Sequence, residues 1–535
     1  MKRVVIKITA LAVALALLLC GCGLDFGGYF DRLAGLFGVV SFDNMEYTRP
    51  DLSPLDGALE DCLESAQRGN NLNELLECIY TLNAICSSYQ TNYRLAYIHY
   101  SMDLTDTYWE TEYNYCAQQS TAVQAAVDEL MYALADCALR SELEAEDYFG
   151  AGYFDDYDGE SIWTEEFSAL MDQETYLINH YYDLSAQAMA LDPDSDEYKT
   201  ICLPQLESLY LELVKLRKRI AVEAGYSSYS EFAYDFYYAR DYTPAQAEAY
   251  LGEIRTELVP LYRRTDFSKV WLEGLEDSTE SQTFRYVQTM AQAMGGSVAD
   301  SFSVMDDAGL YDISYSENKY AASFEVFLPD YMVPFVLMNP TMTGLDRLTF
   351  AHEFGHFCND YASGGTGAGI DVSEFFSQGM EYLSLSYADG GQELAKLKMA
   401  DSLCVFVEQA ALADFEAQVY ALSDNKLTVS RIRNLYRSIS ITYGFSAMVD
   451  DTGYVDIGHL YTSPMYVISY VVSNDAAMQL YQLESEQAGS GLACYTDNLV
   501  TGQIGFLEFL EEAGLESPFA PGRITAVKKT FEAVL

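Results

Sequence analysis

The chain has 535 residues, half of them apolar, which is enough for a large buried core and more than one lobe. Aspartate and glutamate outnumber lysine and arginine by 81 to 30, so the formal net charge is −51. Because phosphate binding needs a positive field, this charge nearly excludes nucleic acid as a partner, and it favours basic over acidic peptides.

The N-terminal residues are typical of a bacterial export signal. Three basic residues precede an apolar stretch over 8–19, which is too short for an ordinary membrane span and leads directly into a cysteine pair. A small residue stands immediately before Cys22, which predicts that Cys22 is lipidated, with Cys20 as the alternative. We therefore expect a signal peptide over 1–21, a tether over 22–54, and an extracytoplasmic lipoprotein anchored to the membrane by its lipid.

The remainder of the chain is predicted to be mainly α-helical. Apolar and acidic residues recur at helical periods with few prolines, which indicates an N-terminal helical lobe over 55–240 and a second lobe over 241–535, with their elements interleaved. Residues 320–339 differ, because they are typical of two short strands around Leu328-Pro329-Asp330. An exposed edge of this small sheet would allow a peptide backbone to pair with it.

His352-Glu353-Phe354-Gly355-His356 forms a HExxH motif on a helix predicted over 345–357. Histidines four residues apart lie on one helix face, where two imidazoles can hold a zinc ion. The chain has only five histidines, so the motif would arise by chance in about one chain in several hundred. A hydrogen-bonded structural pair is the alternative interpretation, but that pair would not need Glu353.

A catalytic zinc site requires a third protein ligand. A second helix is predicted over 371–385, after a glycine-rich turn that allows the chain to reverse. Glu374 lies in the first turn of this helix, 22 residues after His352, a separation that suits a zincin whose third ligand comes from an adjacent helix. Glu381 follows on the same helix face and is the rival ligand, or a partner that orients a histidine.

Several separate stretches of the chain, the motif among them, carry a resemblance to a known family. They are 334–339, 349–356, 374–378 with Glu381, 219–221 with Gly225, Tyr226 and Tyr229, 459–470 and 505–515. Together they resemble the thimet oligopeptidase and oligoendopeptidase F group of zinc metallopeptidases over about residues 200–520. The resemblance implies a two-lobed zincin with a small sheet beside the active site and a deep channel for short peptides. It also implies one Zn²⁺ per chain, held by His352, His356 and Glu374 in the second lobe.

The resemblance further implies that His459, Tyr466 and Tyr470 face the substrate. Relatives commonly space the tyrosine pair three apart, but here the spacing is four, so either tyrosine is a candidate for the oxyanion, and simple core packing is the alternative role. Pro464 predicts a helix that would place both tyrosines on one face. Asn359 stands where many relatives carry another histidine, which is not a metal ligand in the family.

The predicted ligands favour peptide hydrolysis. Zinc lowers the pKa of its water to about 7, and Glu353 is placed to take that proton and deliver it to the leaving amine. The sequence therefore predicts a lipid-anchored zinc oligoendopeptidase that acts on short peptides. The alternatives are a peptidyl-dipeptidase or carboxypeptidase of the same superfamily, and a non-catalytic peptide-binding lipoprotein, which has no reason to keep Glu353.

Overall fold

The computed structural model describes residues 39–145, 149–150, 152–154, 157–159, 162–189, 191–274, 277–365, 368–445, 451–499 and 504–535. The predicted signal peptide, Cys22 and the first part of the tether lie outside these residues. In the described part of the chain, no helix is long and apolar enough to cross a membrane.

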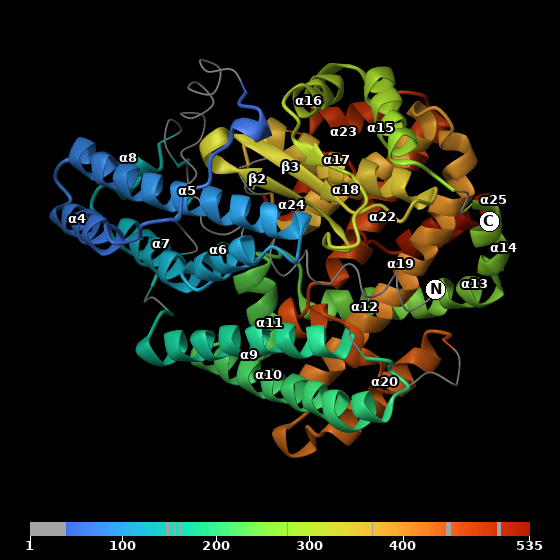
Figure 1. Ribbon diagram of the computed structural model, residues 1–535, viewed down its shortest axis with the longest axis horizontal. Coiled ribbons are helices and arrows are strands. Elements are labelled where there is room, and N and C mark those ends of the chain that lie inside the picture. Colours follow the sequence, from blue (N-terminus) through green and yellow to red (C-terminus); the bar gives the residue numbers. More distant parts are fainter. Residues whose placement is uncertain are drawn as a thin grey trace.

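The protein is mainly helical, as the sequence predicts (Figure 1). The helices before the sheet are α4 (Leu55–Arg68), α5 (Leu72–Met102), α6 (Thr107–Ala117), α7 (Ser120–Ala135), α8 (Arg140–Leu143), α9 (Glu165–Met189), α10 (Leu203–Glu223), α11 (Tyr229–Phe232), α12 (Pro244–Glu257), α13 (Val259–Arg264), α14 (Phe267–Gly274), α15 (Glu280–Met294) and α16 (Gly296–Asp307). The helices after it are α17 (Leu345–Ser363), α18 (Ile370–Tyr387), α19 (Gly391–Tyr420), α20 (Val429–Thr442), α21 (His459–Thr462), α22 (Ile468–Glu486), α23 (Ser490–Asp497), α24 (Phe506–Glu512) and α25 (Arg523–Val534).

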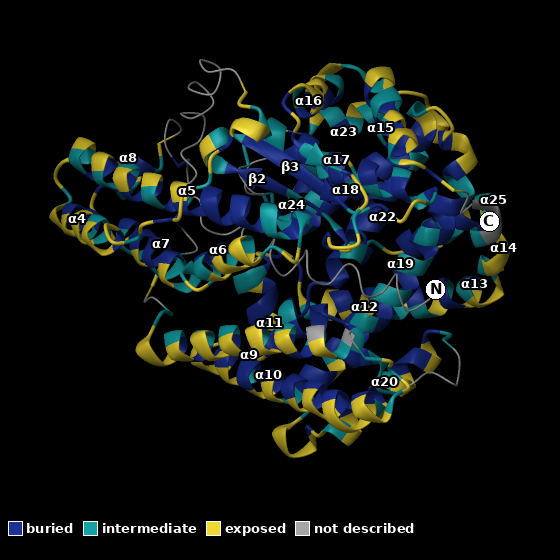
Figure 2. Cartoon of the chain, in the orientation of Figure 1, coloured by how far each residue is buried: buried dark blue, intermediate teal, exposed yellow. Residues whose placement is uncertain are grey.

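Polar side chains begin several of these helices. Asn71 accepts a hydrogen bond from a backbone N–H in the first turn of α5, and Asp106 does the same for α6. Thr243 and Thr279 form capping boxes at α12 and α15. The middle helices of the C-terminal half are buried on most sides, whereas α4, α9 and α10 keep an exposed outer face (Figure 2). The helices that carry the predicted site are therefore in the interior.

The sheet contains the two predicted strands and a third that the sequence does not reveal. β2 (Ser323–Leu328) pairs antiparallel with β3 (Val333–Met338), and the two-residue β1 (Tyr311–Asp312) pairs parallel with the other side of β3. The order β1-β3-β2 leaves β2 at an edge. β3 is buried along its whole length and packs against α17, so the sheet supports the HExxH helix.

Segments from both predicted lobes pack against each other around Arg217. Arg217 of α10 is fully buried, pairs with Glu174 of α9 at 2.5 Å, and donates hydrogen bonds to the carbonyls of Leu460 (3.0 Å) and Tyr461. Helices on either side of residue 240 thus share one hydrogen-bond network, and the boundary at 240 stays a prediction.

Helices α17 and α18 approach closely at Gly355. A Cβ atom on Gly355 would lie 2.6 Å from the Cα of Ser377 and 2.7 Å from the backbone oxygen of Phe376. The glycine inside the HExxH motif therefore lets the two ligand-bearing helices come into backbone contact.

We expect Gly355→Ala to destabilise the protein by about 1–3 kcal/mol, because α17 and α18 would have to separate. The measurement is the free energy of unfolding. Gly57→Ala is the control, since Gly57 is an exposed helical glycine with no atom within 4 Å of its added Cβ, and the same substitution there should be neutral or slightly stabilising. Equal effects at both positions would contradict the close approach.

Candidate metal centre and active site

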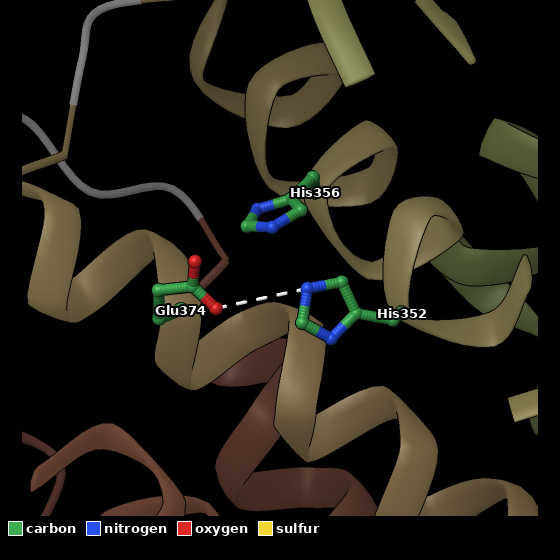
Figure 3. Close-up of side chains that lie close together, drawn as sticks. All are labelled: His352, His356 and Glu374. Carbon is green, nitrogen blue, oxygen red and sulfur yellow. Dashed lines mark ion pairs between the residues drawn. The ribbon is translucent and has the colours of Figure 1, made fainter. Parts of the chain in front are cut away.

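The three predicted metal ligands come together between α17 and α18. His352 and His356 lie one turn apart on α17, with ring centroids 5.0 Å from each other. Glu374 of α18 lies alongside, with its Oε2 3.6 Å from His352 Nε2 (Figure 3). One donor atom of each side chain lies within 4.8 Å of the other two, and the described residues contain no second group of this kind.

Both imidazoles are held by a hydrogen-bond contact at Nδ1. His352 Nδ1 lies 2.9 Å from Glu381 Oε1, and His356 Nδ1 lies 3.0 Å from Ser373 Oγ. These contacts leave the Nε2 atoms for a metal, which is the usual arrangement of ligand histidines. Glu381 therefore lies where a carboxylate that orients His352 belongs, and Glu374 lies where the third ligand belongs.

Negative charge exceeds positive charge in this buried site. Burial by itself lowers the pKa of His352, but its hydrogen bond to Glu381 and the charges of Glu374 and Glu381 raise it to about 9. Burial raises the pKa of Glu374, although His352 and the Tyr466 hydroxyl oppose this shift. Burial and the charge of His352 keep the pKa of His356 well below its usual value. Surplus negative charge with a neutral imidazole fits a divalent cation, and two imidazoles with one carboxylate fit zinc.

Glu353 is buried beside the ligands. Its Oε1 accepts a hydrogen bond of 2.7 Å from the hydroxyl of Ser323, at the start of β2. Burial raises the pKa of Glu353 to about 7, against the opposing effects of His352 and Ser323, and a bound cation would lower it again. A buried carboxylate beside the predicted metal ligands is placed to take a proton and return it.

The segment with the predicted histidine and tyrosines is two helices joined by a loop, with His459 in α21, Tyr466 in the loop and Tyr470 in α22. α21 ends at Thr462 and α22 begins at Ile468, so the expectation that Pro464 opens the helix carrying both tyrosines was wrong. The physical reason is Met465, which has the left-handed φ of 67°. Side chains distant in sequence hold it there: its N–H donates to Glu416 (2.9 Å), and its carbonyl accepts from Arg240 (2.9 Å).

Tyr466 contacts Glu374, and His459 and Tyr470 pack against the Tyr466 ring. The Tyr466 hydroxyl donates a hydrogen bond of 2.8 Å to Glu374 Oε1. The Tyr466 ring is stacked on His459 at 5.7 Å and meets Tyr470 edge-on at 5.1 Å. His459 is buried, and its Nε2 has no hydrogen-bond partner among the described residues. Burial lowers the pKa of His459 to about 4, so it is a neutral imidazole near physiological pH.

Arg240 is a structural residue of the site that the sequence did not reveal. Its guanidinium lies over the rings of Tyr234 and Tyr238, 4.4 and 4.3 Å from their centroids, and 3.4 Å from Asp371 at the start of α18. It also donates a hydrogen bond of 2.7 Å to Ser469. Arg240 thereby joins the segment from Met465 to Ser469 to α18, and no local sequence pattern indicates this contact.

Comparisons with known proteins agree with this architecture. Residues 42–160 match the family model of the peptidase M3 N-terminal domain. No curated protein matches the chain.

Several solved structures share the fold over almost the whole chain. A protein assigned as an oligoendopeptidase F has 21% sequence identity and a TM-score of 0.81, with 92% of this chain and 98% of that chain covered. PZ peptidase A with an inhibitor has 20% identity, a TM-score of 0.80 and the same coverage. A protein from Bacillus anthracis assigned as an oligoendopeptidase F has 21% identity and a TM-score of 0.77, with 93% and 98% covered. The chain thus shares the fold of these solved structures, and its residues 42–160 match the peptidase M3 N-terminal domain.

Proposed function

We propose that this protein is a zinc-dependent oligoendopeptidase that hydrolyses short peptides. The observation that carries the proposal is the convergence of His352, His356 and Glu374, with Glu353 beside them. Zinc bound there would supply the Lewis acidity that polarises a peptide carbonyl and acidifies water. A protein that only binds peptides would need neither this ligand set nor the buried carboxylate next to it.

Glu353 acts as the general base and then as the general acid. It takes the proton of the attacking water and later delivers it to the nitrogen of the leaving amine. The hydrogen bond from Ser323 fixes its carboxylate at the start of the edge strand, so the proton is moved close to a peptide that lies along β2. The position of Glu353 beside the predicted ligands suits this role.

Tyr470 and His459 are the better candidates for stabilising the oxyanion. The proton of Tyr466 is already donated to Glu374, so Tyr466 is placed to orient the third ligand. Tyr470 is only partly buried and packs edge-on against Tyr466, and the unpartnered Nε2 of His459 lies beside the same rings. A donor placed at a developing oxyanion contributes about 3–4 kcal/mol.

The free edge of β2 would receive the substrate backbone. Glu325 is paired with Val336, whose N–H donates to the carbonyl of Leu310 on the other side of β3. Paired residues of this kind turn their backbone groups away from each other, so those of Ser323 and Glu325 point to the free edge. A peptide that pairs with this edge would be recognised through its backbone, which makes cleavage tolerant of side-chain identity.

Arg94 of α5 closes this edge at one end. Its Nη1 donates a hydrogen bond of 2.5 Å to the carbonyl of Phe327, which is the next outward-facing backbone group. The open part of the edge is therefore short and begins beside Glu353. A short open edge favours short peptides, and it is consistent with the deep channel that the family resemblance implies.

Zinc content and chelator-sensitive cleavage test the proposal together. We expect one zinc per chain, and cleavage of a mixed peptide library that a chelator abolishes and zinc restores. A chain that binds peptides without cleaving them would instead be a peptide-binding lipoprotein. Mapping the cleaved bonds in terminally blocked and free peptides separates an endopeptidase from the peptidyl-dipeptidase and carboxypeptidase alternatives.

Replacing Tyr466 or Tyr470 by phenylalanine should change different properties of the enzyme. We expect Tyr470→Phe to lower kcat about 10²–10³-fold with little change in KM, because it removes a donor used only in the transition state. Tyr466→Phe should weaken zinc binding as well, because Glu374 loses the hydroxyl that orients it. The measurements are steady-state kinetics and zinc affinity. Unchanged kinetics and zinc affinity in both variants would show that the two tyrosines only pack in the core.

The extracytoplasmic location of the protein is a separate proposal. We propose that Cys22 carries a lipid that anchors the protein to the membrane, as the apolar stretch and the cysteine pair before residue 23 suggest. Replacing Cys22 by alanine should release the protein from the membrane fraction, whereas Cys20→Ala should not. If only the Cys20 variant were released, Cys20 would be the lipidated residue.

A further inference from the structure

Lys398 on α19 is a buried cation close to the metal centre. It is 1% exposed, and its Nζ lies 2.7 Å from Glu381 Oε2. The other oxygen of Glu381 lies 2.9 Å from His352 Nδ1. Lys398, Glu381 and His352 thus form a continuous chain from α19 through α18 to α17, and the chain ends 3.6 Å from Glu374 at His352 Nε2.

Burial of a lysine is costly, and its position suggests a function other than stability. Removing an ammonium from water costs several kcal/mol, and an apolar side chain of similar size usually serves a core as well or better. Lys398 Nζ also lies 4.8 Å from the centre of the Tyr382 ring, which stabilises a cation but does not require one, and it attracts the carboxylate of Asp401, but the hydrogen bond of its ammonium goes to Glu381. The close partner is therefore Glu381, which also holds the ligand histidine.

Glu381 has two oxygens with different tasks. Oε1 must remain directed at His352 Nδ1 if the imidazole is to keep Nε2 turned toward Glu374. A glutamate has three rotatable bonds, so a hydrogen bond at one oxygen alone leaves the carboxylate able to turn. The ammonium on Oε2 fixes the second oxygen and holds the carboxylate plane in place.

We propose that Lys398 is a positioning residue of the metal centre, which fixes Glu381 so that Glu381 orients His352 toward the bound ion. This inference rests on the proposed zinc-dependent function. Residues that support a ligand histidine in this way typically change metal affinity by about 10–100-fold when they are replaced. Lys398 touches neither substrate nor metal, so its effect should be seen first in zinc binding.

Zinc affinity of variants tests the proposal. The dissociation constant is measured by competition with a chelator in the full chain, alongside the melting temperature of the metal-depleted protein. We expect Lys398→Met to weaken zinc binding about 10–100-fold, and Lys398→Arg to retain most of the affinity because it keeps the positive charge. Lys396→Met, which removes a positive charge from the same helix two residues earlier, should bind zinc like the wild type.

A double variant separates positioning from general stability. If Lys398 acts through Glu381, the Lys398→Met/Glu381→Ala protein should bind zinc no more weakly than Glu381→Ala alone. Additive losses would overturn the proposal, and so would a Lys398→Met protein with wild-type zinc affinity. A wild-type chain that binds no zinc would instead contradict the proposed function, so the two failures are distinguishable.

Discussion

Glu353→Gln should abolish nearly all peptide hydrolysis while zinc binding is retained. Glu353 is 6% exposed and accepts a hydrogen bond from the Ser323 hydroxyl. A glutamine of the same shape keeps this packing but cannot accept the proton of water. General acid–base catalysis contributes about 10²–10⁴-fold, and we expect a loss of kcat in that range. Zinc affinity should remain similar, because the amide leaves both imidazoles and Glu374 in place.

Kinetics and zinc content are measured on the same preparation of this variant. Glu393→Gln is the matched control, since Glu393 is an exposed glutamate on α19 and should keep full activity. The acid limb of the pH profile of kcat/KM, where protonation of the Glu353 carboxylate removes the base, should also be lost in Glu353→Gln, because a glutamine has no carboxylate to protonate. Full activity in Glu353→Gln would refute its role as the base.

The local patterns of the sequence predicted the elements that carry the site. HExxH spacing, the apolar positions around it and the glycine-rich turn predicted two neighbouring helices, and α17 and α18 are those helices with ends extended by a few residues. The extended run over 320–339, with its apolar end, predicted β2 and β3. These predictions succeeded because each depends on a period or a spacing within one short segment.

Contacts between distant segments could not be predicted in this way. β1 is two residues long and pairs with β3, so it is too short to have a period of its own. The left-handed Met465 depends on Glu416 and Arg240, which lie 49 and 225 residues away. The pairing of Lys398 with Glu381 likewise joins two helices through side chains that a single sequence does not relate.

Glu374→Ala should lower zinc affinity far more than any change at Glu381. Glu374 is the carboxylate that faces His352 Nε2, whereas Glu381 is hydrogen-bonded to the other ring nitrogen, Nδ1. The Glu374 variant would therefore lose a metal ligand, and the Glu381 variant would lose the residue that orients a ligand. We expect Glu374→Ala to be isolated with little zinc, and Glu381→Ala to bind zinc about 10–100-fold more weakly than the wild type. Zinc analysis and chelator competition on both variants distinguish the two roles. If only Glu381→Ala lost its zinc, Glu381 would be the third ligand and Glu374 the supporting residue. The hydrogen bond from Tyr466 argues for the expected order, because a hydroxyl that donates to Glu374 Oε1 leaves Oε2 as the oxygen that faces the imidazole.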